Sequence, residues 1–101
     1  MYEELPEVDE IINNHLVVIF SKPNCYYCDL AAVLLTEKNV PFIKFNIGDY
    51  LNDENFDNFY DNLIKKTGQK TFPMIFMKQK FIGGYSELKE LCDSVDTSES
   101  D

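Results

Sequence analysis

The chain has 101 residues, of which 45% are hydrophobic and 14% aromatic, and this composition favours a packed domain over a disordered chain. Eighteen acidic residues against nine lysines, with no arginine, give a net charge of -9, which makes nucleic-acid binding unfavourable. The longest apolar run, residues 30–35, is far shorter than the roughly 20 residues of a membrane span. Because the acidic N-terminus also lacks the apolar segment of a signal peptide, we expect a cytoplasmic protein that has no membrane partner.

The first half of the chain predicts two helices and two strands in alternation. A short helix is expected over residues 7–14, directly after Pro6, a common residue of a first helical turn. Residues 15–20 are β-branched and nearly all apolar, as in a strand that is covered on both faces. A broad apolar stripe predicts a helix over residues 28–38, and a second strand is expected over residues 42–47.

The second half predicts a helix, a hairpin and a last helix. Apolar residues at intervals of three and four predict a helix over residues 53–66, which Gly68 would end. Two short apolar runs, residues 74–77 and 80–82, predict a hairpin, although the two residues between them are a poor turn signal. Ser86 is a candidate N-terminal cap of a helix that ends at Leu91.

This order of elements predicts the fold class. A strand, a helix and a strand in succession require a parallel pair with a right-handed crossover, and the final hairpin is antiparallel. We therefore expect an α/β fold in which helices sandwich a four-stranded mixed sheet. Residues 1–92 would form a single domain, and residues 93–101, polar and acidic without lysine, would form a flexible tail.

Two of the three cysteines, Cys25 and Cys28, are separated by two tyrosines at the junction between the first strand and the following helix. In a chain expected to be cytoplasmic, this spacing at a strand–helix junction indicates a redox pair. The helix N-terminus would favour a thiolate at Cys25 by lowering its pKa, and Cys28, one turn further on, would be more enclosed. Lys22 would add a positive charge near this thiolate.

Zinc binding is the structural alternative for these cysteines. Cys25, Cys28, Cys92 and His15 would supply four ligands of suitable types. The third and fourth ligands would come from opposite ends of the chain without a second paired motif, which disfavours this alternative. Cys92 is instead expected to be a small buried side chain or a partly exposed free thiol.

Three segments together resemble the dithiol glutaredoxins. Residues 21–28, Ser-Lys-Pro-Asn-Cys-Tyr-Tyr-Cys, resemble the active-site loop of that family. Residues 68–73, which end in Thr-Phe-Pro, resemble its Thr-Val-Pro segment, and residues 81–88 resemble its Gly-Gly-x-(Ser/Thr)-Asp-Leu segment. The order and the spacing agree with the family over roughly residues 5 to 92. The resemblance implies a thioredoxin-like fold and the use of glutathione as a reducing co-substrate.

The resemblance also implies a role for each matching residue. Cys25 matches the nucleophilic cysteine, Cys28 matches the resolving cysteine, and Pro73 matches a cis-proline that faces them. The residues implied to bind glutathione are Lys22, Tyr27, Gln69, Thr71, Phe72, Pro73, Gly84, Tyr85, Ser86 and Glu87.

Each part of glutathione has its own implied contacts. Lys22 and Gln69 would hold the glycine carboxylate, and the backbone of Phe72 would bind the cysteinyl part like an added strand. The N–H groups of residues 85–87, at a helix N-terminus, would receive the γ-glutamyl carboxylate. The chain departs from the family pattern at three positions, since Tyr26 replaces the usual proline, Glu87 the usual aspartate and Phe72 the usual valine. Thioredoxin itself is disfavoured because the chain has no tryptophan.

The resemblance therefore implies an enzyme, a glutathione-dependent thiol–disulfide oxidoreductase. It would reduce glutathione mixed disulfides and protein disulfides as a monomer, without a metal, in the cytoplasm. Two alternatives on the same scaffold are an iron–sulfur cluster held between two protomers and a redox-silent binding module.

Overall fold

A mixed four-stranded sheet in the order β2-β1-β3-β4 organises the computed structural model, which describes residues 4–99. β1 runs parallel to β2 and antiparallel to β3, and β3 and β4 form the predicted antiparallel hairpin. The predicted order of helices and strands is confirmed, with one added 3-10 turn, η1. The elements are α1 (Val8–Asn14), β1 (Val17–Ser21), α2 (Tyr26–Glu37), β2 (Ile43–Asn46), η1 (Ile47–Tyr50), α3 (Phe56–Thr67), β3 (Met74–Met77), β4 (Lys80–Gly83) and α4 (Tyr85–Glu99).

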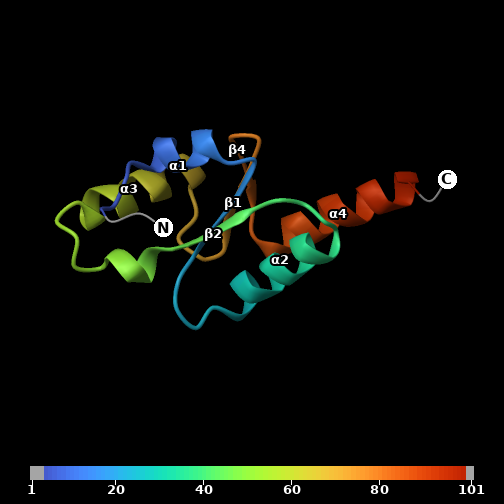
Figure 1. Cartoon of the computed structure of the whole chain (residues 1–101), viewed down its shortest axis with the longest axis horizontal. Helices are drawn as coiled ribbons and strands as arrows, with labels where there is room; N and C mark the ends of the chain where they lie inside the picture. Colours follow the sequence, from blue (N-terminus) through green and yellow to red (C-terminus); the bar gives the residue numbers. More distant parts are fainter. Residues whose placement is uncertain (1–3, 100–101) are drawn as a thin grey trace.

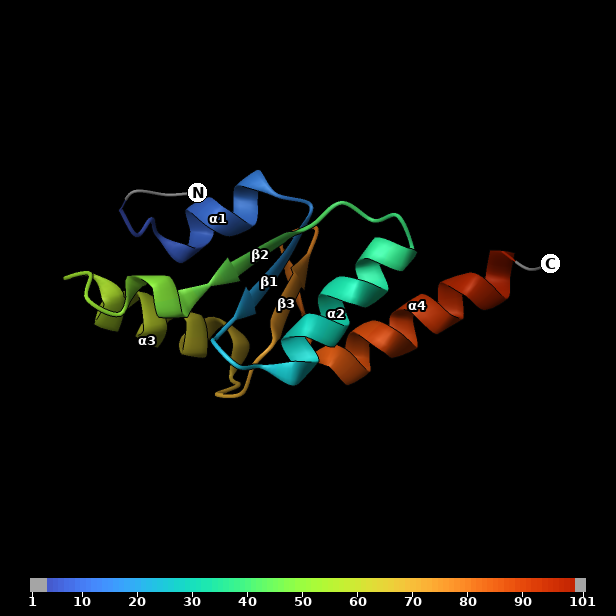
Figure 2. The ribbon, with the colours of Figure 1, turned by 60° about the horizontal axis from the view of Figure 1, so that its bottom comes forward.

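Helices cover both faces of this sheet. Figures 1 and 2 show α1 and α3 on one side and α2 and α4 on the other, with α4 extending away from the body of the molecule. None of the helices within residues 4–99 has the length and apolar character needed to cross a membrane.

The central strand β1 supplies side chains to both layers, which explains why its sequence is almost entirely apolar. Val18 and Phe20 belong to the core cluster on the side of α1 and α3, whereas Val17 and Ile19 belong to the cluster on the side of α2 and α4. Successive side chains of a strand point to opposite faces, so a strand that is covered twice needs apolar residues at consecutive positions.

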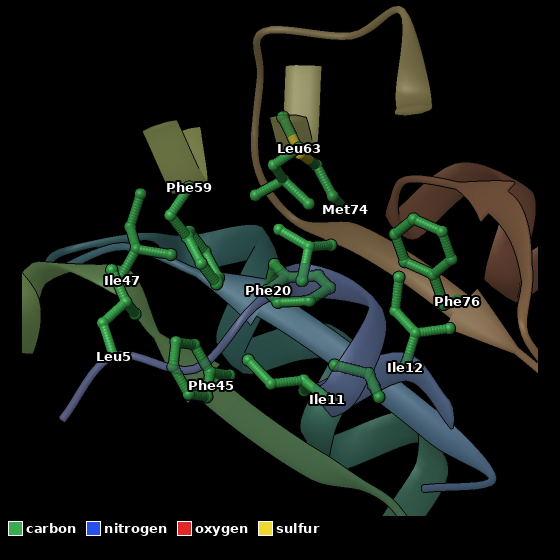
Figure 3. Packing of buried hydrophobic residues seen from close by; sticks show 12 residues of the cluster. Leu5, Ile11, Ile12, Phe20, Phe45, Ile47, Phe59, Leu63, Met74 and Phe76 are labelled. Carbon is green, nitrogen blue, oxygen red and sulfur yellow. The ribbon is translucent and has the colours of Figure 1, made fainter. Parts of the chain in front are cut away.

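Phe20 lies at the centre of the α1/α3 side (Figure 3). Its ring makes edge contacts with Phe45, Phe59 and Phe76, with ring centroids 5.9, 6.1 and 5.7 Å apart. Edge-to-face packing of this kind adds stability beyond the burial of apolar area. These contacts tie β1 to its two neighbouring strands and to α3.

Most element boundaries shift by one to three residues from the prediction, and the start of α2 and the end of α4 are the informative cases. α2 begins at Tyr26 because Cys25 is already its N-cap, and α4 continues to Glu99 although the sequence predicted an end at Leu91. Of the predicted tail, residues 100–101 lie outside the described residues, and its flexibility stays a prediction. The hairpin turn is built by Lys78 and Gln79, both with positive φ (51° and 71°), as a tight turn between twisted strands requires.

Candidate active site

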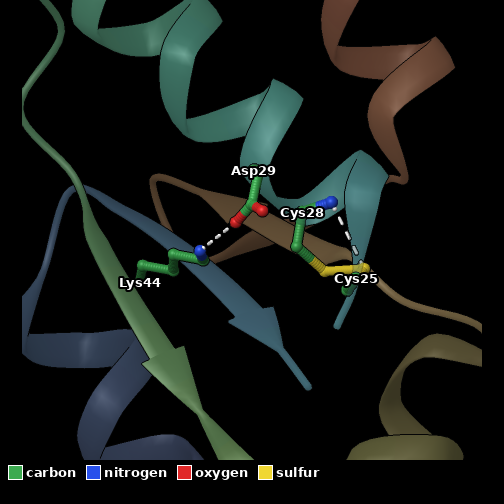
Figure 4. A network of polar contacts seen from close by, with 4 residues as sticks. All are labelled: Cys25, Cys28, Asp29 and Lys44. Atoms are coloured by element: carbon green, nitrogen blue, oxygen red, sulfur yellow. Dashed lines mark hydrogen bonds and ion pairs between the residues drawn. A yellow bond between two sulfur atoms is a disulfide. The ribbon is translucent and has the colours of Figure 1, made fainter. Parts of the chain in front are cut away.

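The two cysteines of the pair lie where β1 leads into α2, and they form a disulfide (Figure 4). Asn24, with φ 58°, turns the chain into α2, and Cys25 lies at the start of this helix, as predicted, where it is the N-cap. Asparagine is among the few residues that adopt this left-handed conformation readily. The Cα atoms of Cys25 and Cys28 are 5.2 Å apart, one helical turn along the chain.

The two sulfur atoms have different environments. Cys25 is half-buried, whereas Cys28 is completely buried beneath the first turn of α2. The backbone N–H of Cys28 donates to Cys25 Sγ at 3.2 Å. An unpaired N–H group and the positive end of the helix dipole both favour negative charge at this position. Cys25 is therefore the more accessible cysteine of the pair, and it lies where the helix N-terminus favours negative charge.

An acidic residue in the same turn works against this effect. Asp29 is in the first turn of α2, and its backbone N–H donates to the carbonyl of Cys25. Its carboxylate is paired with Lys44 of β2, at 2.5 Å between Nζ and Oδ1 (Figure 4). The ion pair neutralises a negative charge that would otherwise disfavour a thiolate nearby.

A groove of about 340 Å³ reaches Tyr27, which lies between the two cysteines, although neither cysteine lines it. Three segments that are far apart in the sequence form its walls, namely the first turn of α2, the loop before β3 and the start of α4. Its lining residues are Tyr27, Gln69, Thr71, Phe72, Pro73, Gly84, Tyr85, Ser86 and Glu87. The described structure thus brings together every residue predicted to bind glutathione except Lys22, which is exposed and is not among the residues lining the groove.

The loop before β3 forms one wall of the groove. The Phe72–Pro73 peptide bond is cis, as the sequence motif implied. The side-chain amide of Gln69 donates to the carbonyl oxygens of Thr71 and Pro73, at 2.7 and 3.1 Å. Both amide donors of Gln69 are therefore used within the protein. The predicted contact of Gln69 with a carboxylate would require one of these hydrogen bonds to open.

The start of α4 forms the opposite wall. The N–H of Leu88 donates to the carbonyl of Gly84 at 3.1 Å, so Gly84 caps this helix rather than Ser86, which lies within its first turn. Glu87 Oε1 accepts a hydrogen bond from the N–H of Gly84 at 2.6 Å. This contact is half of a capping box, in which a side chain three residues into a helix bonds back to the cap. The next N–H groups, those of residues 85–87, have no partner within the helix and are available to an anion.

Three tyrosines connect the cysteine pair to the groove. Tyr26 and Tyr27, which separate the cysteines, are 69% and 56% exposed, and their ring centroids are 5.4 Å apart. Tyr27 also contacts Tyr85 of α4, at 5.8 Å between ring centroids. The ring of Tyr27 therefore belongs both to the cysteine motif and to the wall of the groove. No local sequence signal predicted its contact with Tyr85.

The zinc alternative gains no support from the described residues. Cys92 lies in the core cluster formed with α2, and Cys25 and Cys28 are bonded to each other. Within residues 4–99, no group of three or more histidine, cysteine, aspartate or glutamate side chains is placed to hold a metal ion.

Comparison with known proteins shows that the chain is similar to glutaredoxins. The family model described as Glutaredoxin matches residues 17–82. The chain is 37% identical over 87 residues to Glutaredoxin-2, mitochondrial, of Mus musculus, a match that covers 84% of this chain and 53% of that protein. It is 36% identical to Glutaredoxin-2 of Schizosaccharomyces pombe, with 86% of this chain and 76% of that protein covered. The chain thus spans about half the length of the mitochondrial relatives that it matches.

Solved structures agree with the sequence comparison. The crystal structure of a buckwheat glutaredoxin–glutathione complex has a TM-score of 0.74 at 26% identity, and the match covers 84% of this chain and 74% of the buckwheat chain. A dithiolic glutaredoxin of Trypanosoma brucei brucei has a TM-score of 0.74 at 27% identity, covering 89% and 90% of the two chains. The predicted thioredoxin-like fold is confirmed by these similarities.

Proposed function

This chain belongs to the glutaredoxin family, and we propose that it is a glutathione-dependent thiol–disulfide oxidoreductase. The observation that carries the proposal is the Cys25–Cys28 disulfide at the N-terminus of α2, with a more accessible first cysteine and a groove of about 340 Å³ that Tyr27, between the cysteines, lines. We favour this activity over cluster binding and over a redox-silent role because both cysteines are present and bonded to each other.

Glutathione mixed disulfides are the first proposed substrate class. The Cys25 thiolate attacks the glutathione sulfur of the mixed disulfide, a Cys25–glutathione disulfide forms, and the substrate thiolate leaves and takes up a proton. A second glutathione thiolate then attacks the glutathione sulfur bound to Cys25. This step restores the Cys25 thiolate and releases glutathione disulfide, one half of which is the glutathionyl group of the substrate and the other half the one free glutathione that is consumed.

Protein disulfides are the second proposed substrate class. Cys25 forms a mixed disulfide with the protein, and the thiolate of Cys28 attacks Cys25 Sγ to release the reduced protein. The product of that step is the Cys25–Cys28 disulfide, which is the state of the cysteine pair in this structure. Two glutathione molecules would then reduce it in turn.

The groove is the proposed site of glutathione. Glutathione carries a carboxylate at each end, and we propose a separate group of this protein for each carboxylate, one in the groove and one outside its lining. The free N–H groups at the start of α4 would receive the γ-glutamyl carboxylate, and Lys22 would reach the glycine carboxylate. The extended backbone at Phe72 would pair with the cysteinyl part, which sets the glutathione sulfur toward Cys25. The buckwheat glutaredoxin of similar fold was crystallised as a glutathione complex, which supports this placement.

Partners and location are part of the same proposal. Glutathionylated or disulfide-bonded proteins would be the macromolecular substrates, and the enzyme would act as a cytoplasmic monomer without nucleic acid or membrane. Sedimentation of the purified protein tests the monomeric state, and localisation of a tagged full-length protein in cells tests the cytoplasmic location. A tagged protein found in mitochondria would contradict the proposed location, and a stable dimer would contradict the proposed monomer.

A three-protein comparison tests the activity. Wild type, Cys25→Ser and Cys28→Ser would each be assayed with a glutathionylated peptide and with a protein disulfide, with turnover coupled to reduction of glutathione disulfide. We expect Cys25→Ser to be inactive with both substrates, and Cys28→Ser to keep activity only with the glutathionylated peptide. Cys92→Ser is the matched control and should behave as wild type. Absence of glutathione-dependent turnover by the wild type, or full activity of Cys25→Ser, would disprove the proposal.

A further inference from the structure

A glycine in η1 lies directly against the loop that carries Cys25. A Cβ atom built on Gly48 would lie 2.5 Å from Pro23 Cγ and 2.6 Å from Pro23 Cδ, distances that real Cβ atoms essentially never show. The φ of Gly48 is outside the left-handed region, so the backbone conformation itself would accept other residues. The proline ring, and not the backbone angle, therefore requires glycine at this position.

Gly48 is held in place from its other side. Its N–H donates to Asn46 Oδ1 at 2.9 Å, and the same oxygen would be only 3.0 Å from an added Cβ. Ile47, the preceding residue, is buried in the core at 6% exposure. Pro23, by contrast, lies in an exposed loop between β1 and α2. An added methyl group would therefore displace the loop rather than η1.

Displacement of Pro23 would be transmitted to Cys25 over a short and stiff path. The ring of proline fixes its φ, and Asn24 has the left-handed φ of 58° that turns the chain into α2. The next residue is Cys25, whose Sγ receives the N–H of Cys28 at 3.2 Å. Only one residue thus separates the contact with Gly48 from the cysteine that depends on its position at the helix start.

We propose that Gly48 is a positioning residue for Cys25. The ring of Pro23 packs directly against Gly48, which has no side chain. This contact fixes the loop so that Cys25 is the N-cap of α2 and its sulfur is close to the N–H of Cys28. Loss of this contact moves the sulfur away from the N–H of Cys28 and the N-terminus of α2, both of which favour the thiolate. The inference rests on the proposed function only in taking Cys25 as the reactive thiol.

The test measures the thiolate of Cys25 directly and requires no turnover. Fully reduced wild type, Gly48→Ala, Pro23→Ala and the double variant would be alkylated over a range of pH, with the label on Cys25 quantified by peptide mapping. We expect Gly48→Ala to raise the Cys25 pKa by about half a unit, which lowers the alkylation rate below that pKa roughly threefold. Pro23→Ala should raise the pKa less, and the double variant should match Pro23→Ala, because the added methyl group then has room.

Gly68→Ala is the matched control. Gly68 has φ +66° with nothing within 4 Å of an added Cβ, so this substitution strains a helix end without touching the cysteine loop. It should lower the stability and leave the Cys25 titration unchanged. The proposal would be overturned if the Cys25 pKa of Gly48→Ala equalled that of the wild type. It would also be overturned if the double variant raised this pKa as much as Gly48→Ala does.

Two further results keep the test decisive. If Gly48→Ala does not fold, Pro23→Ala decides alone, since an unchanged Cys25 titration in that variant would also overturn the proposal. Failure of the proposed function is a separate observation, namely a wild type without glutathione-dependent turnover, and it would leave the pattern of Cys25 titrations unaffected.

Discussion

Lys44 Nζ lies 2.5 Å from Asp29 Oδ1, so an ion pair joins β2 to the first turn of the helix that Cys25 caps. Removing the lysine with Lys44→Ala should raise the Cys25 pKa, because the unpaired carboxylate of Asp29 disfavours a nearby thiolate. Removing the carboxylate with Asp29→Asn should lower it. Both side chains are well exposed, 37% and 67%, so each shift should stay below about 0.7 unit, the equivalent of about 1 kcal/mol.

The pH dependence of Cys25 alkylation measures both shifts. Lys89→Ala, which breaks an exposed ion pair with Asp93 on α4, is the control and should leave the Cys25 titration unchanged. Shifts of the same sign in Lys44→Ala and Asp29→Asn would show that the pair does not act on Cys25 through its charge.

Glu87 should stabilise the start of α4 through its hydrogen bond with Gly84. Glu87→Ala leaves that N–H without its partner and should lower the free energy of unfolding by about 1 kcal/mol. Glu87→Gln keeps an acceptor oxygen, so its free energy of unfolding should fall clearly less than that of Glu87→Ala. Urea denaturation of the two variants measures the difference, and equal losses would mean that the capping bond contributes little.

The main features of the fold could be predicted because they follow from local patterns. Alternation and helical periodicity predicted the order of elements, and the all-apolar residues 15–20 predicted a strand covered on both faces. The placement of Cys25 at a helix start needed only the break in pattern before it. The end of α4 was missed because aspartate, serine and threonine after Leu91 indicate a chain leaving a helix, and such propensities are weak.

The site contacts that were missed join residues remote in sequence. Lys44 with Asp29, Gly48 with Pro23, and Tyr27 with Tyr85 meet only after the sheet and helices have packed. Each of these residues has an ordinary role when it is read alone, as an exposed charge, a turn residue or a surface ring. Their partners are set by the strand order and the crossover, which a local pattern does not specify.

Gln69 offers a direct test between two roles, support of the loop and contact with a carboxylate. Its amide donates to the carbonyl of Pro73, a buried residue, so Gln69→Ala should leave that acceptor without its partner. We expect the free energy of unfolding to fall by about 1 to 3 kcal/mol. Lys70→Ala, at the exposed neighbouring position, is the control and should not change it. Unchanged stability of Gln69→Ala with a raised KM for glutathione would instead assign Gln69 to ligand binding.

Cys92 should make the stability depend on pH in the alkaline range. Burial raises the pKa of its thiol above the ordinary 9.0, an effect that Lys38 partly offsets and that Asp93 reinforces. A raised pKa in the folded state means that the contribution of the thiol is fully present below about pH 9 and is lost as the pH rises through the folded-state pKa. The free energy of unfolding should therefore fall more steeply above pH 9 in the wild type than in Cys92→Ala. Urea denaturation at a series of pH values measures this free energy. The same decrease above pH 9 in both proteins would contradict the prediction.

Lys22 separates glutathione binding from support of the thiolate. Its side chain is exposed and does not line the groove, and the N-terminus of α2 with the N–H of Cys28 already favours the Cys25 thiolate. Lys22→Ala should therefore raise the KM for glutathione by no more than about fivefold, the equivalent of about 1 kcal/mol, with kcat and the Cys25 pKa unchanged.

Ionic strength provides the second readout for Lys22. An exposed pair between Lys22 and a glutathione carboxylate is screened by salt, so the difference between wild type and Lys22→Ala should shrink as salt is added. Lys80→Ala, which removes an exposed charge from β4, is the matched control and should leave KM unchanged at every salt concentration. A Cys25 pKa that rises by about one unit in Lys22→Ala, with unchanged dependence on glutathione, would assign the lysine to the thiolate instead.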